Sequence, residues 1–261
     1  MLETIKKIIK QAGKIAIAGY HASSKVIHHK GATDIVTQTD LKIEDFIRSQ
    51  ILQYYPDHDL LMEETDNELK KSNHLWIIDP LDGTTNFAHK FPFFAISIAY
   101  EENQIRQLAA VYIPFFQELF WAEKDMGAYL NGRKIQVSET AEISQSLIAT
   151  GFPYDRWQKG DYYLQEFAAF MKRAQGIRRA GAAAIDLCYT ACGRLDGFFE
   201  RKLKPWDTAA GSLIVREAGG KVTNYSGDLQ HYTEDTIIAS NGIIHQNMLD
   251  ILSQVNQGEK N

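Results

Sequence analysis

The sequence has little of several features that mark specialised proteins. It holds only two cysteines in 261 residues, too few for a disulfide-stapled secreted domain. Residues 1–14 alternate lysine with isoleucine and lack the apolar core of a signal peptide. No stretch approaches the roughly eighteen consecutive apolar residues that a membrane-spanning helix needs. These absences predict a protein of the reducing cytoplasm with no membrane span.

The chain also lacks an excess of positive charge, internal repeats and low-complexity segments. It has 28 basic and 33 acidic residues, a formal net charge of −5, so we expect no general attraction to nucleic acid or to an anionic membrane. The acid excess instead makes a metal site plausible. With 44% hydrophobic residues, the composition is that of an ordinary globular protein, long enough for one large domain or two lobes sharing one body.

The N-terminal half predicts two helices followed by a sheet. Apolar residues recur every three or four positions over residues 2–16, and again from about residue 41 to Tyr55, where Pro56 ends the pattern and Thr39 or Asp40 can cap the start. Between residues 75 and 137 the texture changes to short β-rich runs, including a hairpin through residues 115–116 and a turn at residues 131–132. Residues 65–73 are expected to form a mobile loop.

The C-terminal half alternates strand-like and helical segments. Strands are predicted near residues 146–152, 196–200, 221–225 and 236–240, and helices near residues 162–173, 181–193, 207–218 and 245–252. We therefore expect an N-terminal α+β lobe at residues 1–145 and a C-terminal α/β lobe at residues 146–261. Together they would form one compact, layered sandwich of helices and sheets with a site in the cleft between the lobes.

The most informative string is WIIDPLDGTTNF at residues 76–87. Three apolar residues run into Asp79 and Asp82, and a Gly-Thr turn follows. A buried strand that ends this way can aim two carboxylates at a hard cation. The backbone amides of residues 83–85 could then open a helix whose N-terminus attracts an anion, so that metal and phosphate meet at one turn. Taken alone, the string could also be an Asp-rich turn after a strand, the less favoured of the two interpretations.

Two further acidic positions stand at the edges of predicted elements. Glu63 and Glu64 follow an apolar pair, and Asp207 opens a helix after Pro205. Taken singly, a glutamate pair of this kind is usually solvated surface, and an aspartate at a helix start is usually its N-cap. Asp40 also fits a simple N-cap. In combination with residues 79–82, these positions match a known pattern.

The chain resembles the inositol monophosphatase family of metal-dependent, lithium-sensitive phosphatases over nearly its whole length. Six blocks in order carry the resemblance, which makes it far more specific than a lone D-x-x-D-G. They are DIVTQTD at residues 34–40, EE at 63–64, DPLDGTTNF at 79–87, GAAA at 181–184, DGFFE at 196–200, and WDTAAG at 206–211 leading to EAGG at 217–220. The resemblance implies the layered αβαβα sandwich of the sugar phosphatase type.

The resemblance also implies a set of metal ligands and a mechanism. Glu63, Asp79 and the backbone carbonyl of Leu81 would hold one Mg²⁺, and Asp79, Asp82 and Asp207 a second. Such a pair of ions can clamp an in-line displacement by water, with no covalent intermediate. Thr84, hydrogen-bonded to Asp40, would orient or deprotonate the water, and Glu63 would act through its metal. The loop around Lys30 and Asp34 would carry ligands of a weaker third ion.

Substrate contacts follow from the same resemblance. Phosphate would meet the turn at residues 82–85, that is Asp82, Gly83, Thr84 and Thr85, and ring hydroxyls would meet Asp82, the backbone of Gly181, Ala182 and Ala183, Glu200 and Asp207. Ala182 departs from the threonine often found there, which removes a hydroxyl and leaves substrate preference less secure. The predicted substrate is a small phosphate monoester, inositol-1-monophosphate first. The same resemblance implies lithium inhibition and a homodimer.

Several rival interpretations remain open. Fructose-1,6-bisphosphate is the alternative substrate, and histidinol phosphate a third; the residues after Asp82-Gly83-Thr84 are not the Lys-Glu-Phe of relatives that act on phosphoadenosine phosphate. Cys188 and Arg194 have the Cys-x5-Arg spacing of cysteine phosphatases, but the small apolar residues around Cys188 indicate a packed helix. In a reading of another class, the chain is a regulatory binding partner of the transcription or ribosome-assembly machinery, with basic residues near 172–179 and 201–204.

Overall fold

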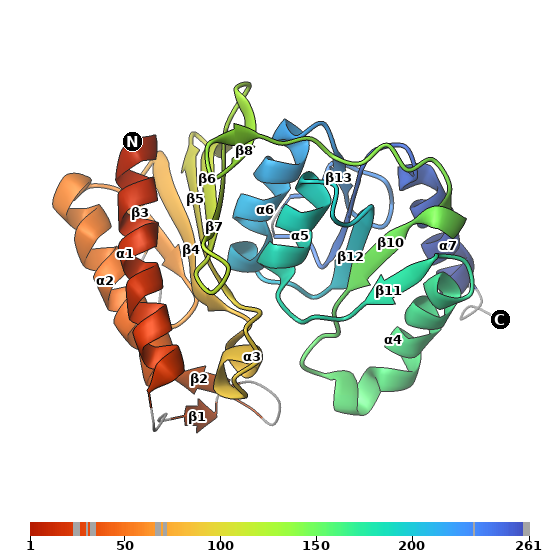
Figure 1. Ribbon diagram of the computed structural model, residues 1–261, viewed down its shortest axis with the longest axis horizontal. Helices are drawn as coiled ribbons and strands as arrows, with labels where there is room; N and C mark the ends of the chain where they lie inside the picture. The colour runs from red at the N-terminus through yellow and green to blue at the C-terminus, as the bar shows by residue number, and fades with distance from the viewer. Residues whose placement is uncertain are drawn as a thin grey trace.

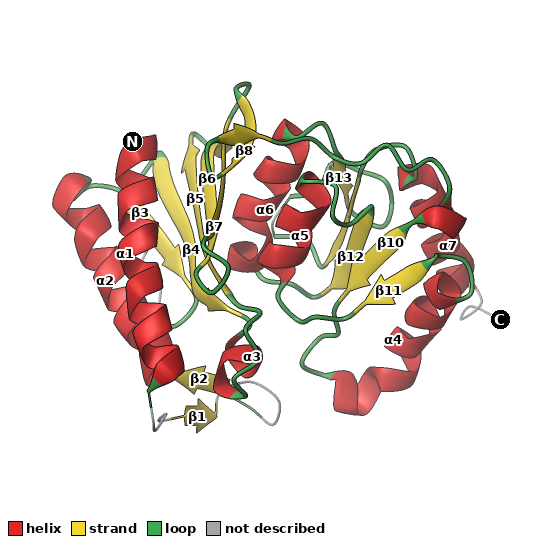
Figure 2. Ribbon diagram, viewed as in Figure 1, coloured by secondary structure: helices red, strands yellow, loops and turns green. Residues whose placement is uncertain are grey.

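The computed structural model describes residues 1–22, 27–29, 31, 35–65, 69, 72–231 and 233–257. Helices and sheets alternate in five layers, which Figure 1 shows from one side and Figure 2 in colours of secondary structure. The expected αβαβα sandwich is therefore confirmed. The predicted roles of Lys30 and Asp34, and most of the loop expected at residues 65–73, lie outside the described residues.

The first sheet has seven strands, in the order β3-β4-β5-β6-β7-β8-β9. Only β3 and β4 run parallel, because the strands after β4 follow one another as antiparallel neighbours. Asn131 and Gly132 both have positive φ, 48° and 83°, as the predicted two-residue turn requires. The strands are β3 (Asp59–Met62), β4 (His74–Asp82), β5 (Ala95–Glu102), β6 (Ile105–Ile113), β7 (Glu118–Glu123), β8 (Gly127–Leu130) and β9 (Arg133–Lys134).

Two long helices, α1 (Leu2–His21) and α2 (Gln38–Tyr54), cover the outer face of this sheet. The apolar stripe predicted for α1 is buried against it. Helix α2 begins three residues before the predicted start, because its N-cap is Thr37: the Thr37 hydroxyl accepts a hydrogen bond from the Thr39 N–H at 3.2 Å. Neither Thr39 nor Asp40 is the N-cap residue, so that part of the prediction is wrong. Asp40 nevertheless caps the helix start from its third position, because its Oδ2 accepts a hydrogen bond from the Thr37 N–H at 3.1 Å. A small antiparallel pair, β1 (Ile27–His29) and β2 (Ile35–Thr37), precedes α2.

The central layer consists of α5 (Ala183–Ala191) and α6 (Pro205–Glu217), which pack together between the two sheets. Small side chains allow the close approach, since a Cβ added at Gly211 of α6 would lie 2.5 Å from Leu187 Cδ1 of α5. Helix α6 contacts strands β4 to β8 of the first sheet and β13 and β14 of the second. The two halves of the chain thus share one core.

The second sheet has five strands, in the order β11-β10-β12-β14-β13, with α4 (Arg156–Met171) and α7 (His245–Gln257) on its outer face. Helix α4 starts six residues before its predicted start at residue 162. A short 3₁₀ helix, η1 (Ile143–Gln145), leads into this half. The strands are β10 (Leu147–Thr150), β11 (Gly176–Arg178), β12 (Gly197–Arg201), β13 (Lys221–Thr223) and β14 (Thr236–Ser240).

Candidate active site

A cavity of about 150 Å³ opens between the two halves of the chain. Its walls come from the end of β4, the start of the short helix α3 (Thr84–Ala88), the start of α5, the end of β12 and the start of α6. Nine residues predicted from the sequence line it: Asp82, Gly83, Thr84, Thr85, Gly181, Ala182, Ala183, Glu200 and Asp207. Four other predicted residues lie outside the lining: Glu63, Asp79, Leu81 and Asp40.

A bulge in β4 decides how its two aspartates point. Asp79 pairs with Ser97 and Asp82 with Ala95, so three steps on β4 oppose two steps on β5. In a regular strand residues three apart face opposite sides of the sheet. The extra residue at Pro80–Leu81 changes this alternation and re-aims the side chains beyond it. It also sends Leu81 into the core, where its side chain is buried.

The acidic side chains predicted as metal ligands influence one another electrostatically. Burial raises the pKa of Asp79 well above its usual value, and the charges of Glu63, Asp82 and Asp207 raise it further. A hydrogen bond from the Leu81 N–H to Asp79 Oδ1, at 2.8 Å, acts in the opposite direction. Carboxylates from β3's end, β4 and α6 thus lie near enough to repel one another when ionised.

Asp82 is anchored from the opposite wall of the cavity. Its Oδ2 accepts a hydrogen bond from the Ala184 N–H at the start of α5, at 2.8 Å, a position where a helix N-terminus stabilises negative charge. Burial nevertheless raises the pKa of Asp82 to about 7, against the lowering effect of the α5 amides. One carboxylate therefore joins the two halves of the site.

The donor chemistry fits a hard divalent cation. Four carboxylates and a backbone carbonyl offer oxygen alone, which is the ligand type that Mg²⁺ prefers, and a cation would relieve the repulsion around Asp79. In the part of the chain that the structure describes, no three His, Cys, Asp or Glu side chains are arranged to hold one metal ion as they stand. Some side-chain rotation would therefore have to accompany binding.

Thr84 connects the cavity to a buried carboxylate behind it. Its hydroxyl lies 2.9 Å from Asp40 Oδ1 and 3.0 Å from the Leu81 carbonyl oxygen. One hydroxyl proton can be donated to only one of these acceptors at a time. Burial raises the pKa of Asp40, while hydrogen bonds from Thr37 and Thr84 lower it. The pair expected from the sequence is therefore in contact, with Asp40 at the third position of α2.

The turn predicted to meet phosphate is built on a glycine. Gly83, the N-cap of α3, has φ 86°, in the left-handed region that favours glycine. Asn86 in α3 donates from Nδ2 to the carbonyls of Phe93 and Ala180, at 2.8 and 2.9 Å, and so ties this turn to the segment before α5. The sequence predicted a helix start here, and α3 provides it.

Glu200 stands at the end of β12, beside Gly151 at the end of β10. Burial raises its pKa to about 8, and the positive charge of Arg179 opposes that effect. A Cβ added at Gly151 would fall within 3.0 Å of all three Glu200 carboxyl atoms, closer than real Cβ atoms come. The space for the Glu200 carboxyl therefore depends on this glycine.

Asp207 sits at the third position of α6, and Lys204 is the N-cap. Asp207 Oδ2 accepts a hydrogen bond from the Lys204 N–H at 2.6 Å. The default reading of Asp207 as an N-cap is therefore wrong by three residues. From the first turn, the Asp207 carboxylate caps the start of α6 by accepting the hydrogen bond from Lys204, and Asp207 also lines the cavity.

Sequence reasoning missed two residues at the cavity. Arg156 lines it, and Asp186 of α5 lies close by, where burial raises its pKa and the charges of Glu200 and Asp82 raise it further. Arg179 and Lys204 also line the cavity, although the sequence placed them only in its basic clusters. Arg156 and Lys204 stand near predicted helix starts, but nothing in the sequence relates those starts to one another. Their convergence depends on how the second sheet pairs its strands.

The cysteine motif belongs to the core. Cys188 is fully buried in α5, and burial raises its pKa well above the usual value, which disfavours the reactive thiolate. Arg194 instead forms an ion pair with Glu118 at 2.5 Å. The Cys-x5-Arg spacing therefore does not mark a nucleophile here.

Among the described helices, none is both long enough and apolar enough to span a bilayer.

Comparisons with known proteins agree with this architecture. Over 233 residues the chain is 47% identical to the inositol-1-monophosphatase of Synechocystis, covering 88% of this chain and 81% of that one. It is 38% identical over 252 residues to the Nus factor SuhB of Escherichia coli K12, covering 95% and 94%. The crystal structure of the suppressor protein SuhB from Bartonella henselae superposes with a TM-score of 0.92 at 39% identity, covering 96% and 97%.

A further solved structure bears on the cofactor. An inositol monophosphatase/NADP phosphatase complexed with Mg²⁺ and phosphate superposes with a TM-score of 0.85 at 25% identity, covering 96% of this chain and 94% of that one. A sequence model of the inositol monophosphatase family matches residues 1–257. The chain therefore belongs to the inositol monophosphatase family of metal-dependent phosphatases and is a phosphoric monoester hydrolase.

Proposed function

We propose that the protein hydrolyses inositol-1-monophosphate to inositol and phosphate, with Mg²⁺ held by Glu63, Asp79, Leu81, Asp82 and Asp207. The observation that supports the proposal is the convergence of four carboxylates. The charges of Glu63, Asp82 and Asp207, from three separate parts of the chain, raise the pKa of Asp79 beyond the effect of its burial. When bound, divalent cations at such a site lower the pKa of a water and stabilise the leaving oxygen.

The protein's own groups would position the reactants. The start of α3 offers the free backbone amides of its first turn to the phosphate oxygens. Thr84, held between Asp40 and the Leu81 carbonyl, would pass its proton to Asp40 and accept one from the attacking water. No nucleophilic side chain is needed, and the buried Cys188 offers none.

Recognition of the polyol would come from the opposite wall. Glu200 and Asp207 offer carboxyl oxygens, and the segment 181–183 offers backbone groups, to ring hydroxyls. Ala182 contributes only main-chain contacts. We expect two or three ions at working concentrations and a homodimer in solution, and both follow from the family resemblance stated above.

Asp82→Asn tests the proposal directly. The amide is isosteric, but it loses the charge that a cation needs, so turnover of inositol-1-phosphate should fall by at least about a thousandfold while far-UV circular dichroism and the melting temperature stay near wild type. Asp228→Asn, an exposed aspartate remote from the cavity, is the matched control. Near-normal magnesium-dependent activity in Asp82→Asn would remove that residue from the mechanism.

A second candidate function comes from the relative named Nus factor SuhB, at 38% identity. Exposed basic residues at positions 172, 173, 178 and 179 give this chain a surface suited to an anionic or protein partner. The two functions separate in one experiment: complementation of a deletion strain. Rescue by wild type and loss of rescue by Asp82→Asn would favour catalysis, whereas equal rescue by both would favour the partner role.

A further inference from the structure

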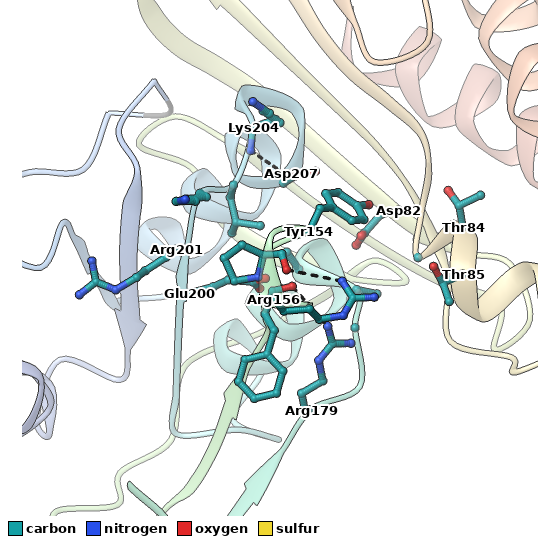
Figure 3. A pocket seen from close by; sticks show the side chains of 18 of the residues that line it. Asp82, Thr84, Thr85, Tyr154, Arg156, Arg179, Glu200, Arg201, Lys204 and Asp207 are labelled. Atoms are coloured by element: carbon teal, nitrogen blue, oxygen red, sulfur yellow. Dashed lines mark hydrogen bonds between the residues drawn. The ribbon is translucent and has the colours of Figure 1, made fainter. Parts of the chain in front are cut away.

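Helix α2 carries two fully buried carboxylates one turn apart. Asp40 and Glu44 each have 0% exposure, and residues four apart lie on the same face of a helix. Asp40 accepts a hydrogen bond from Thr84, which Figure 3 shows on the α3 side of the cavity. Glu44 has no part in the proposed mechanism. Because a buried carboxylate is costly unless it is paired and hydrogen-bonded, its partners indicate what it does.

Glu44 holds the chain just beyond β3. Its Oε2 accepts a hydrogen bond from the Glu64 N–H at 2.9 Å. Its Oε1 accepts one from Arg48 Nη2 at 3.3 Å, one turn further along α2. Arg48 Nη2 also donates to the Thr65 hydroxyl. Two side chains of α2 therefore hold two successive residues of the segment that follows β3.

Glu63 lies between these contacts and the first sheet. On one side, Met62 ends β3, is buried and pairs with Ile78 of β4. On the other side, Glu44 holds Glu64 in a bend that belongs to no helix or strand. The backbone of Glu63 is therefore anchored from both directions.

This anchoring concerns two predicted metal ligands at once. Because Met62 pairs with Ile78 in parallel strands, the next residue of each strand, Glu63 and Asp79, comes to a neighbouring position. Two ionised carboxylates at such positions repel each other, whereas a divalent cation needs both. An anchored backbone limits how far Glu63 can move away from Asp79. Contacts that orient the ligands of a metal typically change its affinity by about 10–100-fold.

We propose that Glu44 and Arg48 are positioning residues that hold Glu63 where a divalent cation can use it, and so raise the affinity of the site for the cation. The inference rests on the proposed function, which makes Glu63 and Asp79 ligands of Mg²⁺. Neither Glu44 nor Arg48 lines the cavity, so both act through residues 63–65. A purely structural role would stabilise α2 without changing the affinity for the cation.

Metal binding by the substrate-free protein tests this without any turnover. Mn²⁺ takes the same oxygen ligands as Mg²⁺, and electron paramagnetic resonance measures the unbound ion. Glu44→Gln keeps the size of the side chain, but its amide cannot accept hydrogen bonds at both ends as the carboxylate does. We expect the dissociation constant for Mn²⁺ to rise by about tenfold or more. Asp45→Asn removes an exposed negative charge from the next position of α2 and is the matched control, expected within about twofold of wild type.

A double-variant cycle separates a positioning role from a structural one. If Glu44 acts through Glu63, then Glu44→Gln should change the Mn²⁺ dissociation constant by less than about twofold once Glu63→Gln is present, because effects that share one partner are not additive. Arg48→Gln removes the second holding side chain from a partly exposed position and should also weaken Mn²⁺ binding. It decides the question alone if Glu44→Gln does not fold.

An unchanged Mn²⁺ dissociation constant in Glu44→Gln, or in Arg48→Gln if the first variant does not fold, would overturn the inference whatever happens to the melting temperature. A loss of affinity that persists undiminished beside Glu63→Gln would also overturn it. A different result would separate this inference from the proposed function. If Glu44→Gln weakens Mn²⁺ binding as expected but wild type releases no phosphate from inositol-1-phosphate, the proposed substrate fails and the positioning role stands.

Discussion

Gly151→Ala is the substitution whose effect on the candidate site can be worked most directly from the structure. Gly151 follows β10, and Glu200 is the last residue but one of the neighbouring parallel strand β12. The added methyl carbon would lie within 3.0 Å of Glu200 Cδ, Oε1 and Oε2 together. Gly151 does not have positive φ, so alanine fits its backbone without strain. The substitution therefore acts on Glu200 through space alone.

The expected loss of activity follows from the overlap between the added methyl carbon and the Glu200 carboxyl group. Non-bonded heavy atoms settle near 3.5 Å, so the carboxyl group must move by about 1 Å or more. A misplacement of about 1 Å in a positioning group can cost about a hundredfold in rate. We therefore expect kcat/KM for inositol-1-phosphate to fall by about a hundredfold, with the larger part in KM because Glu200 would bind ring hydroxyls rather than the reacting phosphate.

The assay is steady-state phosphate release from two esters. p-Nitrophenyl phosphate has no ring hydroxyls, so its kcat/KM should change by less than about threefold. Gly160→Ala is the matched control, because a Cβ there meets no described atom within 4 Å. An inositol-1-phosphate kcat/KM within about twofold of wild type in Gly151→Ala would refute the reasoning. Equal losses on both esters would place the damage at the metal site instead.

Three other predictions concern stability and inhibition. His245 is buried, with Nε2 2.8 Å from Thr223 Oγ1 and Nδ1 2.8 Å from Ser240 Oγ, and burial lowers its pKa from 6.5 to about 4. As the pH falls, the His245 imidazole therefore becomes protonated in the unfolded chain before it does in the folded protein. The free energy of unfolding should be highest above pH 6.5 and should fall by up to about 3 kcal/mol as the pH is lowered to 4. Urea titrations at several pH values should show that the free energy of unfolding depends less on pH in His245→Gln than in wild type. An equal pH dependence in the two proteins would contradict this. Gly211→Ala should lower the free energy of unfolding by about 1–3 kcal/mol, because the added Cβ would meet Leu187 Cδ1 at 2.5 Å. Gly132→Ala is the control for backbone strain, because Gly132 has positive φ but its added Cβ would lie in open space. An unchanged melting temperature in Gly211→Ala would show that α5 and α6 can separate freely. Lithium at millimolar concentration should inhibit phosphate release, with a half-inhibiting concentration that depends on magnesium in cross-titration; inhibition matched by equal sodium would argue against a specific effect.

Much of the fold was predictable because local patterns and burial agree. The apolar stripe of α1, the hairpin between β6 and β7, and the Asn131–Gly132 turn each depend on residues close in sequence. The helix starts were predicted less well. At α2 and α6 the acidic residue that looked like a cap stands three positions inside the helix, and Thr37 and Lys204 begin the helices instead.

The candidate site shows where sequence reasoning stops. The acidic positions were recognisable through the family resemblance, but the bulge at Pro80–Leu81 depends on pairing with β5, and a strand's register is set by its partner. Arg156 and Arg179 are 23 positions apart and meet only because β10 and β11 run parallel around α4. Long-range pairing of this kind leaves no signal in either segment alone.

Helix α6 carries Asp207 at its first turn while its length is wedged between both sheets. A swinging motion of one half against the other would have to shear this wedge from one sheet, breaking a close-packed interior. Opening and closing around a substrate must therefore belong to peripheral segments and side chains. Because Asp207 comes so late in the chain, a nascent chain that ends before this helix cannot yet bring together all four predicted acidic ligands.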